Sequence, residues 1–278
     1  MLERVRARSP VFTVPPFQEI VFMPTPQELS NPQAIRAIFF DVGFTLLAPH
    51  PSVTKIVQDA CLRQGIVIDV NCLRQQQKRS EDYLRSMSRA QPWTWSDETA
   101  ITEIWTSYFT EMLRPCLANQ PHRLDACVEE TVRAFDDAGN YALYPDVLPC
   151  LQALHAHGLT LGVISDWGVS LSLVLRHYDL IAFFDFAVIS AQVRRAKPDP
   201  QLFQTALERA DAIPDYTLHI GDSYVLDVLG ARSVGITPIL LDRRQVHDPA
   251  QMDCLVATTL YDLLDWLRIP RPSDEAIP

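Results

Sequence analysis

Residues 37–46 read Ala-Ile-Phe-Phe-Asp-Val-Gly-Phe-Thr-Leu, an apolar run that is interrupted by a carboxylate. The run lies between Pro32 and Pro49, and its length is typical of a fully buried strand in a parallel sheet. Asp41 would then stand at the carboxyl end of that strand, where open α/β sheets bind their ligands. A carboxylate there is a candidate nucleophile or metal ligand, although an Asp can equally cap the following turn.

The composition is that of an ordinary globular protein. The 278 residues are 47% hydrophobic and 21% charged, which suffices for one large or two moderate domains with a sizeable core. The formal net charge of −10 argues against a nucleic-acid or anionic-membrane partner, because both bind basic surfaces. There is no run of 18 apolar residues, so we expect no membrane span.

The cysteines are widely spaced and include no CxxC pair. A disulfide framework or a zinc site needs tighter clustering, so neither is expected. We predict small buried hydrophobic side chains in a reducing, cytoplasmic compartment. The six residues are Cys61, Cys72, Cys116, Cys127, Cys150 and Cys254.

Residues 1–34 contain six prolines and no sustained period, which predicts an irregular N-terminal extension. An organellar targeting segment is the alternative, because arginines stand at positions 4, 6 and 8, but Glu3 and Glu19 interrupt the basic character. No apolar stretch typical of a secretory signal follows these arginines.

The pattern changes to helical periods after Pro49. Apolar residues follow the i, i+3, i+4, i+7 spacing over four turns between residues 101 and 116. No strand is expected between Pro49 and about residue 159, so four amphipathic helices would form a small bundle inserted into an α/β domain. The other predicted helices lie near 53–64, 71–89 and 122–137. The predicted domains are 49–141 for the helical bundle and 35–48 with 142–270 for the α/β core.

Strands and helices alternate in the remainder of the chain. This alternation implies right-handed crossovers and a parallel sheet flanked by helices. Apolar stretches predict strands near 159–164, 184–189, 217–220, 237–241 and 254–257.

Polar residues follow several of these strands. Asp41, Ser165 and Asp222 each stand at the end of a predicted buried strand, and Lys197 lies in the loop after another. The carboxyl ends of parallel strands meet at one edge of a sheet, so we expect these four side chains to be neighbours. Two carboxylates opposite a Lys and a Ser hydroxyl suit a magnesium ion and a phosphate-like group.

These motifs resemble those of the haloacid dehalogenase (HAD) superfamily. The first motif is matched by Asp41-Val42-Gly43-Phe44-Thr45, the second by Ser165, the third by Lys197 of Lys-Pro-Asp-Pro, and the fourth by Gly221-Asp222-Ser223-Tyr224-Val225-Leu226-Asp227. The resemblance covers about residues 37–242. It implies an α/β fold with a Rossmann-like parallel sheet and a four-helix cap domain inserted just after the first motif.

The resemblance also implies a role for each matched residue. Asp41 would attack the substrate and form a covalent aspartyl intermediate, and Thr45 would help to position it. Ser165 would hydrogen-bond the transferred group, while Lys197 would stabilise the nucleophile and the phosphoryl oxygens. The implied activity is a hydrolase, namely a phosphatase of small phosphorylated metabolites.

Magnesium is the cofactor that the resemblance implies. Asp222 would bind Mg²⁺ together with the carboxylate of Asp41 and the backbone carbonyl of Gly43. Asp227 would orient Lys197 or a metal-bound water.

Gly43 departs from the pattern of the family's phosphatases. The residue two after the nucleophile is there a second Asp, which protonates the leaving alcohol and then activates water. A general acid–base contributes about 10²–10⁴-fold, so turnover of poor leaving groups should suffer. Three explanations are open. The enzyme uses leaving groups that need no protonation, or it recruits another acid such as Asp166 or a cap residue. Alternatively, the chain is a catalytically impaired binding protein.

Two other branches of the family tolerate a non-acid at this position. Dehalogenases attack a carbon–halogen bond, but the Gly221-Asp222 pair is typical of a metal site. Phosphonate hydrolases use a cap lysine. A phosphonate hydrolase would therefore need Lys78 or Lys55 to reach the site.

Overall fold

The structure is a computed structural model that describes residue 29 and residues 31–90 and 95–272. Most of the predicted N-terminal extension therefore lies outside the described residues. Of its described part, Leu29 is buried against the core and Pro32–Ala34 forms a short 3-10 turn.

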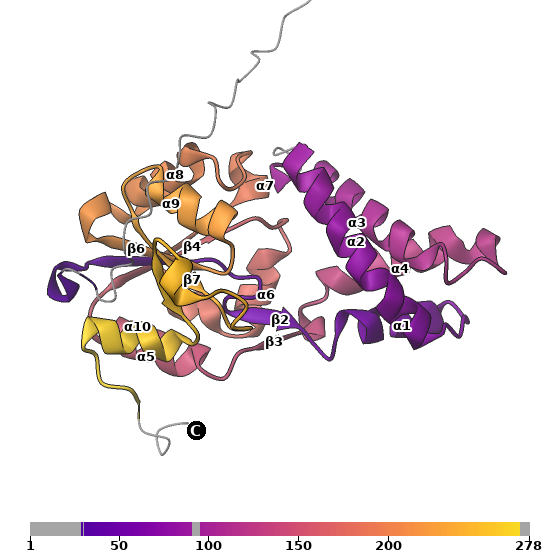
Figure 1. The fold of residues 1–278 in the computed structure, drawn as a ribbon, viewed down its shortest axis with the longest axis horizontal. Coiled ribbons are helices and arrows are strands. Elements are labelled where there is room, and N and C mark those ends of the chain that lie inside the picture. Colours follow the sequence, from indigo (N-terminus) through magenta and orange to yellow (C-terminus); the bar gives the residue numbers. More distant parts are fainter. Residues whose placement is uncertain (1–28, 30, 91–94, 273–278) are drawn as a thin grey trace, which may run out of the picture.

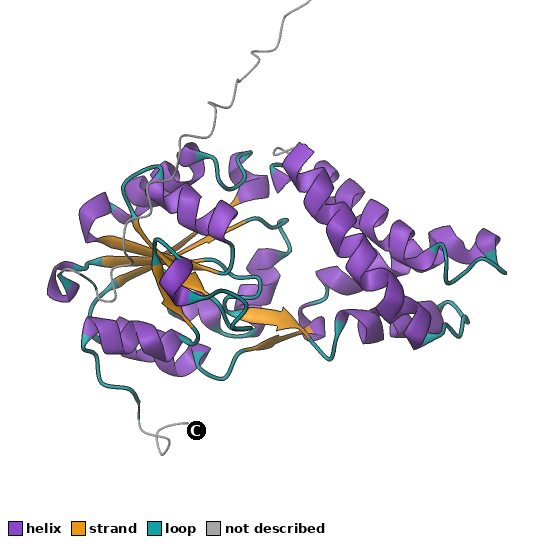
Figure 2. Ribbon diagram, in the orientation of Figure 1, coloured by secondary structure: helices purple, strands orange, loops and turns teal. Residues whose placement is uncertain are grey.

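Six strands form one parallel sheet in the order β5-β4-β1-β6-β7-β8, which confirms the predicted fold class (Figure 2). β1 lies in the centre, with β4 and β5 on one side and the three later strands on the other. The order of the strands therefore reverses at β1, and such a reversal marks the ligand-binding crevice of α/β sheets. The strands are β1 Ala37–Phe40, β4 Thr160–Ser165, β5 Phe186–Ile189, β6 Thr217–Gly221, β7 Thr237–Leu241 and β8 Leu255–Ala257.

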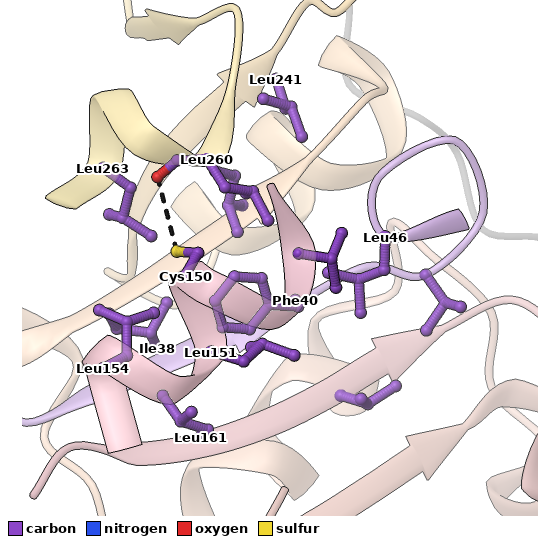
Figure 3. Close-up of a cluster of buried hydrophobic side chains, with 14 of the residues drawn as sticks. Ile38, Phe40, Leu46, Cys150, Leu151, Leu154, Leu161, Leu241, Leu260 and Leu263 are labelled. Carbon is purple, nitrogen blue, oxygen red and sulfur yellow. Dashed lines mark hydrogen bonds between the residues drawn. The ribbon is translucent and has the colours of Figure 1, made fainter. Parts of the chain in front are cut away.

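Helices cover both faces of this sheet (Figure 1). The side chains of β1 alternate between the faces: Ile38 and Phe40 join one apolar cluster, and Phe39 joins the other. Figure 3 shows the first cluster, where Cys150 of α5 donates to the carbonyl oxygen of Leu260 of α10 at 3.5 Å. The helices are α5 Val147–Ala156, α6 Leu171–His177 and α10 Leu260–Leu267 on that side, α8 Pro200–Ala210 and α9 Leu229–Arg232 on the other, and a short α7 Ser190–Val193.

Four further helices, which we call the helical unit, lie beside the sheet (Figure 1). They are α1 Val53–Arg63, α2 Val70–Ala90, α3 Glu98–Leu113 and α4 Leu124–Asp136, close to the ranges that the periodicity predicts. The side chains of Ser52 and Asp97 accept hydrogen bonds from backbone amides in the first turns of α1 and α3. The apolar faces of the helices meet in a separate core that includes Phe109.

Two short strands connect the helical unit to the sheet. β2 Leu47–Pro49 pairs with β3 Tyr141–Leu143 in antiparallel register. The expectation of no strand between Pro49 and about residue 159 is therefore wrong, because β3 lies in this interval. A strand of three residues is too short to show the two-residue period in the sequence. β3 forms because the chain that leaves the helical unit pairs with β2, which leads into it.

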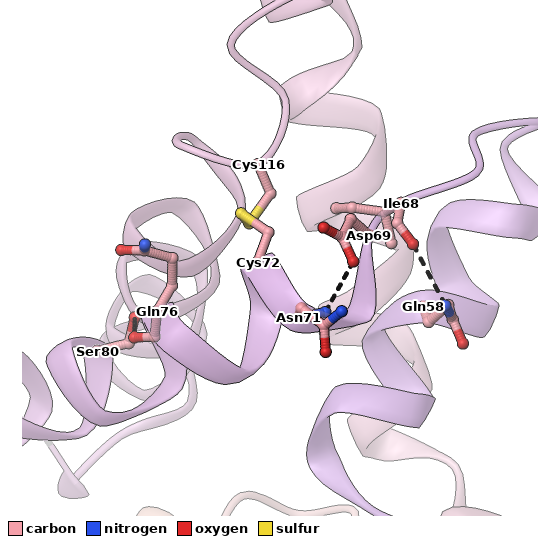
Figure 4. The surroundings of a disulfide bond; sticks show 8 residues. All are labelled: Gln58, Ile68, Asp69, Asn71, Cys72, Gln76, Ser80 and Cys116. Carbon is pink, nitrogen blue, oxygen red and sulfur yellow. Dashed lines mark hydrogen bonds between the residues drawn. A yellow bond between two sulfur atoms is a disulfide. The ribbon is translucent and has the colours of Figure 1, made fainter.

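A disulfide joins two of the cysteines, contrary to the expectation for all six (Figure 4). Cys72 in the first turn of α2 is bonded to Cys116, which follows α3, with 5.7 Å between their Cα atoms. The wide sequence spacing gave no sign of this bond because α2 and α3 pack side by side and bring distant positions together. The other four cysteines are free and buried, as expected.

No helix within residues 31–90 and 95–272 is long and apolar enough to cross a membrane.

Candidate active site

Lys197 stands at the centre of a buried group of polar side chains. Its Nζ lies 2.7 Å from Oδ1 of Asp41 and 2.6 Å from Oδ1 of Asp227. Ser165 donates to the same oxygen of Asp41 at 3.4 Å. The four side chains are almost completely shielded from solvent. Hydrogen-bonded partners in this group are therefore up to 156 positions apart in the sequence.

The sheet directly positions three of the site residues that the sequence predicts. Asp41 follows β1, and its backbone amide donates to the carbonyl oxygen of Ile220 in β6 at 2.9 Å. Ser165 is the last residue of β4, and Asp222 follows β6. β1 pairs in parallel with both β4 and β6, so these three ends lie side by side.

Lys197 is held from a loop rather than from a strand. Its backbone amide donates to Oδ1 of Asp166 at 3.0 Å, and this bond ties the loop to the end of β4. The Asp166 carboxyl group thus supports the loop of Lys197. Its other oxygen is buried without a hydrogen-bond partner among the described residues, and burial raises the pKa of Asp166 to about 7.

Asp227 is the most fully paired carboxylate of the group. Besides Lys197, its Oδ1 contacts Nε2 of His219 at 3.0 Å, and its Oδ2 accepts from the amide of Ser223 at 3.0 Å. Gly221 makes this possible, because a Cβ atom there would lie 2.2 Å from Cγ of Asp227. Asp227 therefore pairs with Lys197, and both of its carboxylate oxygens have partners.

His219 is a site residue that the sequence analysis missed. It is fully buried in β6 beneath Asp227, and its ring packs against Phe203 with 5.2 Å between the centroids. Burial lowers the pKa of His219, despite the opposing effect of the hydrogen bond to Asp227. The only local signal is a histidine in the middle of an otherwise apolar strand.

The charges in this group determine its protonation. Burial lowers the pKa of Lys197, but the charges of Asp227 and Asp41 outweigh that effect and raise it, so the amine stays charged. Burial raises the pKa of Asp41, partly offset by Lys197. Burial and the negative charges of Asp41 and Asp227 raise the pKa of Asp222 to about 8.

Ionisation of both Asp41 and Asp222 would place two negative charges in one buried site, and a bound cation would relieve their repulsion. Oδ2 of Asp41 accepts no hydrogen bond from any described residue, and Asp222 interacts with Asp41 through its charge. No three His, Cys, Asp or Glu side chains in the described part of the chain are grouped as metal ligands. Mg²⁺ is commonly bound by one or two carboxylates with water, so two carboxylates and the carbonyl of Gly43 fit this ion.

Thr45 is buried in the loop that follows Asp41, and its Oγ1 has no hydrogen-bond partner among the described residues. Its carbonyl oxygen accepts hydrogen bonds from Arg243, at 3.1 Å from Nε and 2.8 Å from Nη2. Arg243 lies just after β7 and was not recognised from the sequence. Nothing in its local sequence points to a partner 198 positions away.

The helical unit reaches the loop that follows β4. Oε2 of Glu98, at the start of α3, accepts a hydrogen bond from the backbone amide of Val169 at 3.0 Å. Asp136 stands at the exposed end of α4, where partial burial still raises its pKa although a hydrogen bond with Ser170 opposes this. The two lysines that a phosphonate hydrolase would need are engaged elsewhere or exposed: Lys55 pairs with Asp59, and Lys78 lies on the surface of α2.

The family model of the haloacid dehalogenase-like hydrolases matches residues 35–235. The chain belongs to this family. The finding confirms the resemblance seen in the four motifs, and it makes the chain a HAD-like hydrolase. The matched range begins just before β1 and ends just before β7, so it includes the helical unit.

Similar proteins support the same assignment. The HAD-like hydrolase is 31% identical over 214 residues to haloacid dehalogenase-like hydrolase domain-containing protein 3 of Danio rerio, covering 76% of this chain and 86% of the relative. It is 27% identical over 225 residues to glyceraldehyde 3-phosphate phosphatase of Methanopyrus kandleri, covering 77% and 87%. Among solved structures, the YfnB protein of Bacillus subtilis, bound to magnesium, superimposes with a TM-score of 0.70 at 19% identity over 84% of this chain and 99% of its own.

Proposed function

We propose that this HAD-like hydrolase is a magnesium-dependent phosphatase of small phosphorylated molecules. The observation that carries the proposal is the buried arrangement around Asp41, in which Lys197 contacts one carboxylate oxygen and the other accepts no hydrogen bond within the described residues. A carboxylate held in this way has one oxygen fixed and one available for attack. The phosphatase named among the relatives supports the same class of substrate.

The proposed reaction has two displacements at phosphorus. Oδ2 of Asp41 attacks phosphorus, and the bond to the leaving oxygen breaks with its electron pair going to that oxygen. Water then attacks the phosphorus of the aspartyl phosphate, the bond to Oδ2 breaks, and Asp41 is regenerated as a carboxylate. The proton that water loses passes to the released phosphate or to solvent.

The chain's own residues stabilise the negative charge that develops in both steps. Lys197 supplies a buried cation, which is kept charged by Asp227 and Asp41. Ser165 and Thr45 offer hydroxyl groups to the phosphoryl oxygens. Mg²⁺ would be held by Asp41, Asp222 and the carbonyl of Gly43, and when bound it supplies further positive charge to the transferred group.

Gly43 limits the leaving groups. No side chain at this position can protonate the departing oxygen, so phosphates of acidic alcohols, acids or phenols are the favoured substrates. Asp166 is a poor replacement, because one of its oxygens binds the amide of Lys197 and the other is buried. In this proposal the helical unit is a cap domain whose residues select the substrate.

The test compares phosphate release from an aryl phosphate by the wild type and by Asp41→Asn, with magnesium and with a chelator. We expect release that needs both magnesium and Asp41. Asp215→Asn is the matched control, since Asp215 is exposed and stands just before β6, at the end of that strand opposite to Asp222. Equal background release by wild type and Asp41→Asn would overturn the phosphatase and leave a HAD-like protein that binds a ligand without turnover. Halide release from a 2-haloacid without metal would instead indicate a dehalogenase.

A further inference from the structure

Arg243 makes four side-chain hydrogen bonds to two partners that lie far away in the sequence. Nε and Nη2 donate to the carbonyl oxygen of Thr45, at 3.1 and 2.8 Å. Nη1 and Nη2 donate to the two carboxylate oxygens of Asp146, both at 3.0 Å. The planar guanidinium group therefore binds a main-chain oxygen and a carboxylate at the same time, which a lysine amine cannot reproduce.

The surroundings fix this side chain further. The guanidinium carbon lies 3.9 Å from the centre of the Tyr144 ring. Asp146 is only 5% exposed, and its Oδ2 also accepts from the amide of Leu260 at 2.7 Å. Arg243 is thus part of a largely buried, hydrogen-bonded group rather than a surface ion pair.

The bonded carbonyl belongs to the loop that carries the nucleophile. Residues 41–47 are otherwise held by a few backbone bonds, among them Leu46 N to Val42 O at 2.9 Å. The same loop is joined to the return connection from the helical unit, where Tyr144 N donates to Leu46 O at 3.0 Å. Arg243 contacts both segments, since Tyr144 and Asp146 lie in that connection and Thr45 lies in the loop.

We propose that Arg243 is a positioning residue, which fixes the nucleophile loop by holding the carbonyl of Thr45 against the return connection at residues 144–146. The hydroxyl of Thr45 is buried and accepts or donates no hydrogen bond within the described residues, so its direction depends on the backbone of Thr45. Arg243 holds that backbone. The effect of Arg243 on catalysis rests on the phosphatase function proposed above, whereas its effect on the loop does not.

The first test is Arg243→Lys, which keeps a cation beside Asp146 but loses the planar fork. We expect kcat with an aryl phosphate to fall about 10-fold or more, because small displacements of reacting groups cost up to about 10²-fold. KM should change by less than about twofold, since the substrate groups themselves remain. The matched control is Arg232→Lys, because Arg232 also makes a bidentate pair, with Asp253, on the surface. Equal kinetic effects of the two substitutions would overturn the proposal.

The second test needs no enzymatic activity. Amide hydrogen exchange of the Arg243→Lys protein should be faster in residues 42–47 and 144–147 and unchanged in the helical unit. Arg243→Ala should show the same faster exchange. Guanidinium ion, added to this variant at low concentration, should slow exchange in residues 42–47 and 144–147 again and restore kcat. If exchange became faster over the whole chain, or if guanidinium ion had no effect on Arg243→Ala, the pair of Arg243 with Asp146 would have only a structural role. If the wild type releases no phosphate, the phosphatase fails while the exchange result still decides the role of Arg243.

Discussion

The ring of Trp167 lies beside the space that a side chain at Gly43 would occupy, with Cζ3 at 3.6 Å from the Cβ position. This is an ordinary van der Waals distance, and Gly43 does not have the positive φ angle that side chains avoid. A larger residue can therefore begin at this position without displacing its neighbours. Packing therefore does not require a glycine at position 43, and it leaves room for an acidic side chain to begin there.

Gly43→Asp should therefore raise the turnover of alkyl phosphates, whose leaving oxygen needs a proton. The gain can reach about 10²–10⁴-fold if the acid is all that the site lacks. Turnover of aryl phosphates should rise much less, since their leaving groups depart without protonation. The control is Gly43→Asn, which has nearly the same size and no acidic proton. A similar gain in both variants would point to packing instead of proton transfer, and no gain would mean that the site differs more widely.

Removal of the buried amine at Lys197 should strongly destabilise the fold. Lys197→Met leaves Asp41 and Asp227 without their shared cation, and breaking a buried pair in this way costs about 3–5 kcal/mol. Urea unfolding measures the loss. Lys55→Met is the control, because Lys55 and Asp59 form an exposed pair that should contribute less than about 1 kcal/mol. Adding Asp227→Asn to Lys197→Met should recover part of the loss, and a further loss would contradict the electrostatic explanation.

Glu98 and Gly168 should be energetically coupled across the contact between the helical unit and the sheet domain. A Cβ atom at Gly168 would lie 2.9 Å from Oε1 of Glu98, so Gly168→Ala should displace that carboxylate from the amide of Val169. We expect a cost of about 1 kcal/mol in the free energy of unfolding, typical of one hydrogen bond.

The same substitution in a Glu98→Ala background gives the control for this coupling. With no carboxylate to displace, Gly168→Ala should then cost almost nothing, and the two changes should be non-additive. Additive costs in urea unfolding would show that Gly168→Ala acts through some other contact.

Reduction of the disulfide should destabilise the helical unit. Cys72 and Cys116 close a loop with a sequence separation of 44, and a crosslink of this kind contributes about 2–4 kcal/mol. Thermal unfolding followed by circular dichroism, with and without a thiol reductant, measures the effect. The Cys72→Ser/Cys116→Ser variant should melt like the reduced wild type and ignore the reductant. An identical melting curve for oxidised wild type and this variant would rule out a stabilising disulfide.

Local sequence patterns were sufficient for the sheet and for much of the candidate site. Asp41, Ser165 and Asp222 each follow an apolar run long enough to predict a buried strand, and parallel topology then implies that their side chains meet. The helices of the helical unit could also be predicted, because apolar residues recur with the helical period along one face of each helix. Strand β3 could not, since three residues show no period.

Burial patterns and motifs were thus enough to identify the family, the sheet and the place of the candidate nucleophile Asp41, because the information lies in adjacent residues. The bonds of His219 and Arg243, the contact of Glu98 with Val169 and the Cys72–Cys116 disulfide became visible only in the folded chain. Except for His219, whose partner is 8 positions away, each joins residues separated by 44 or more positions. Such pairs leave no local trace, because a side chain's partner depends on which elements pack together and not on its neighbours in the sequence.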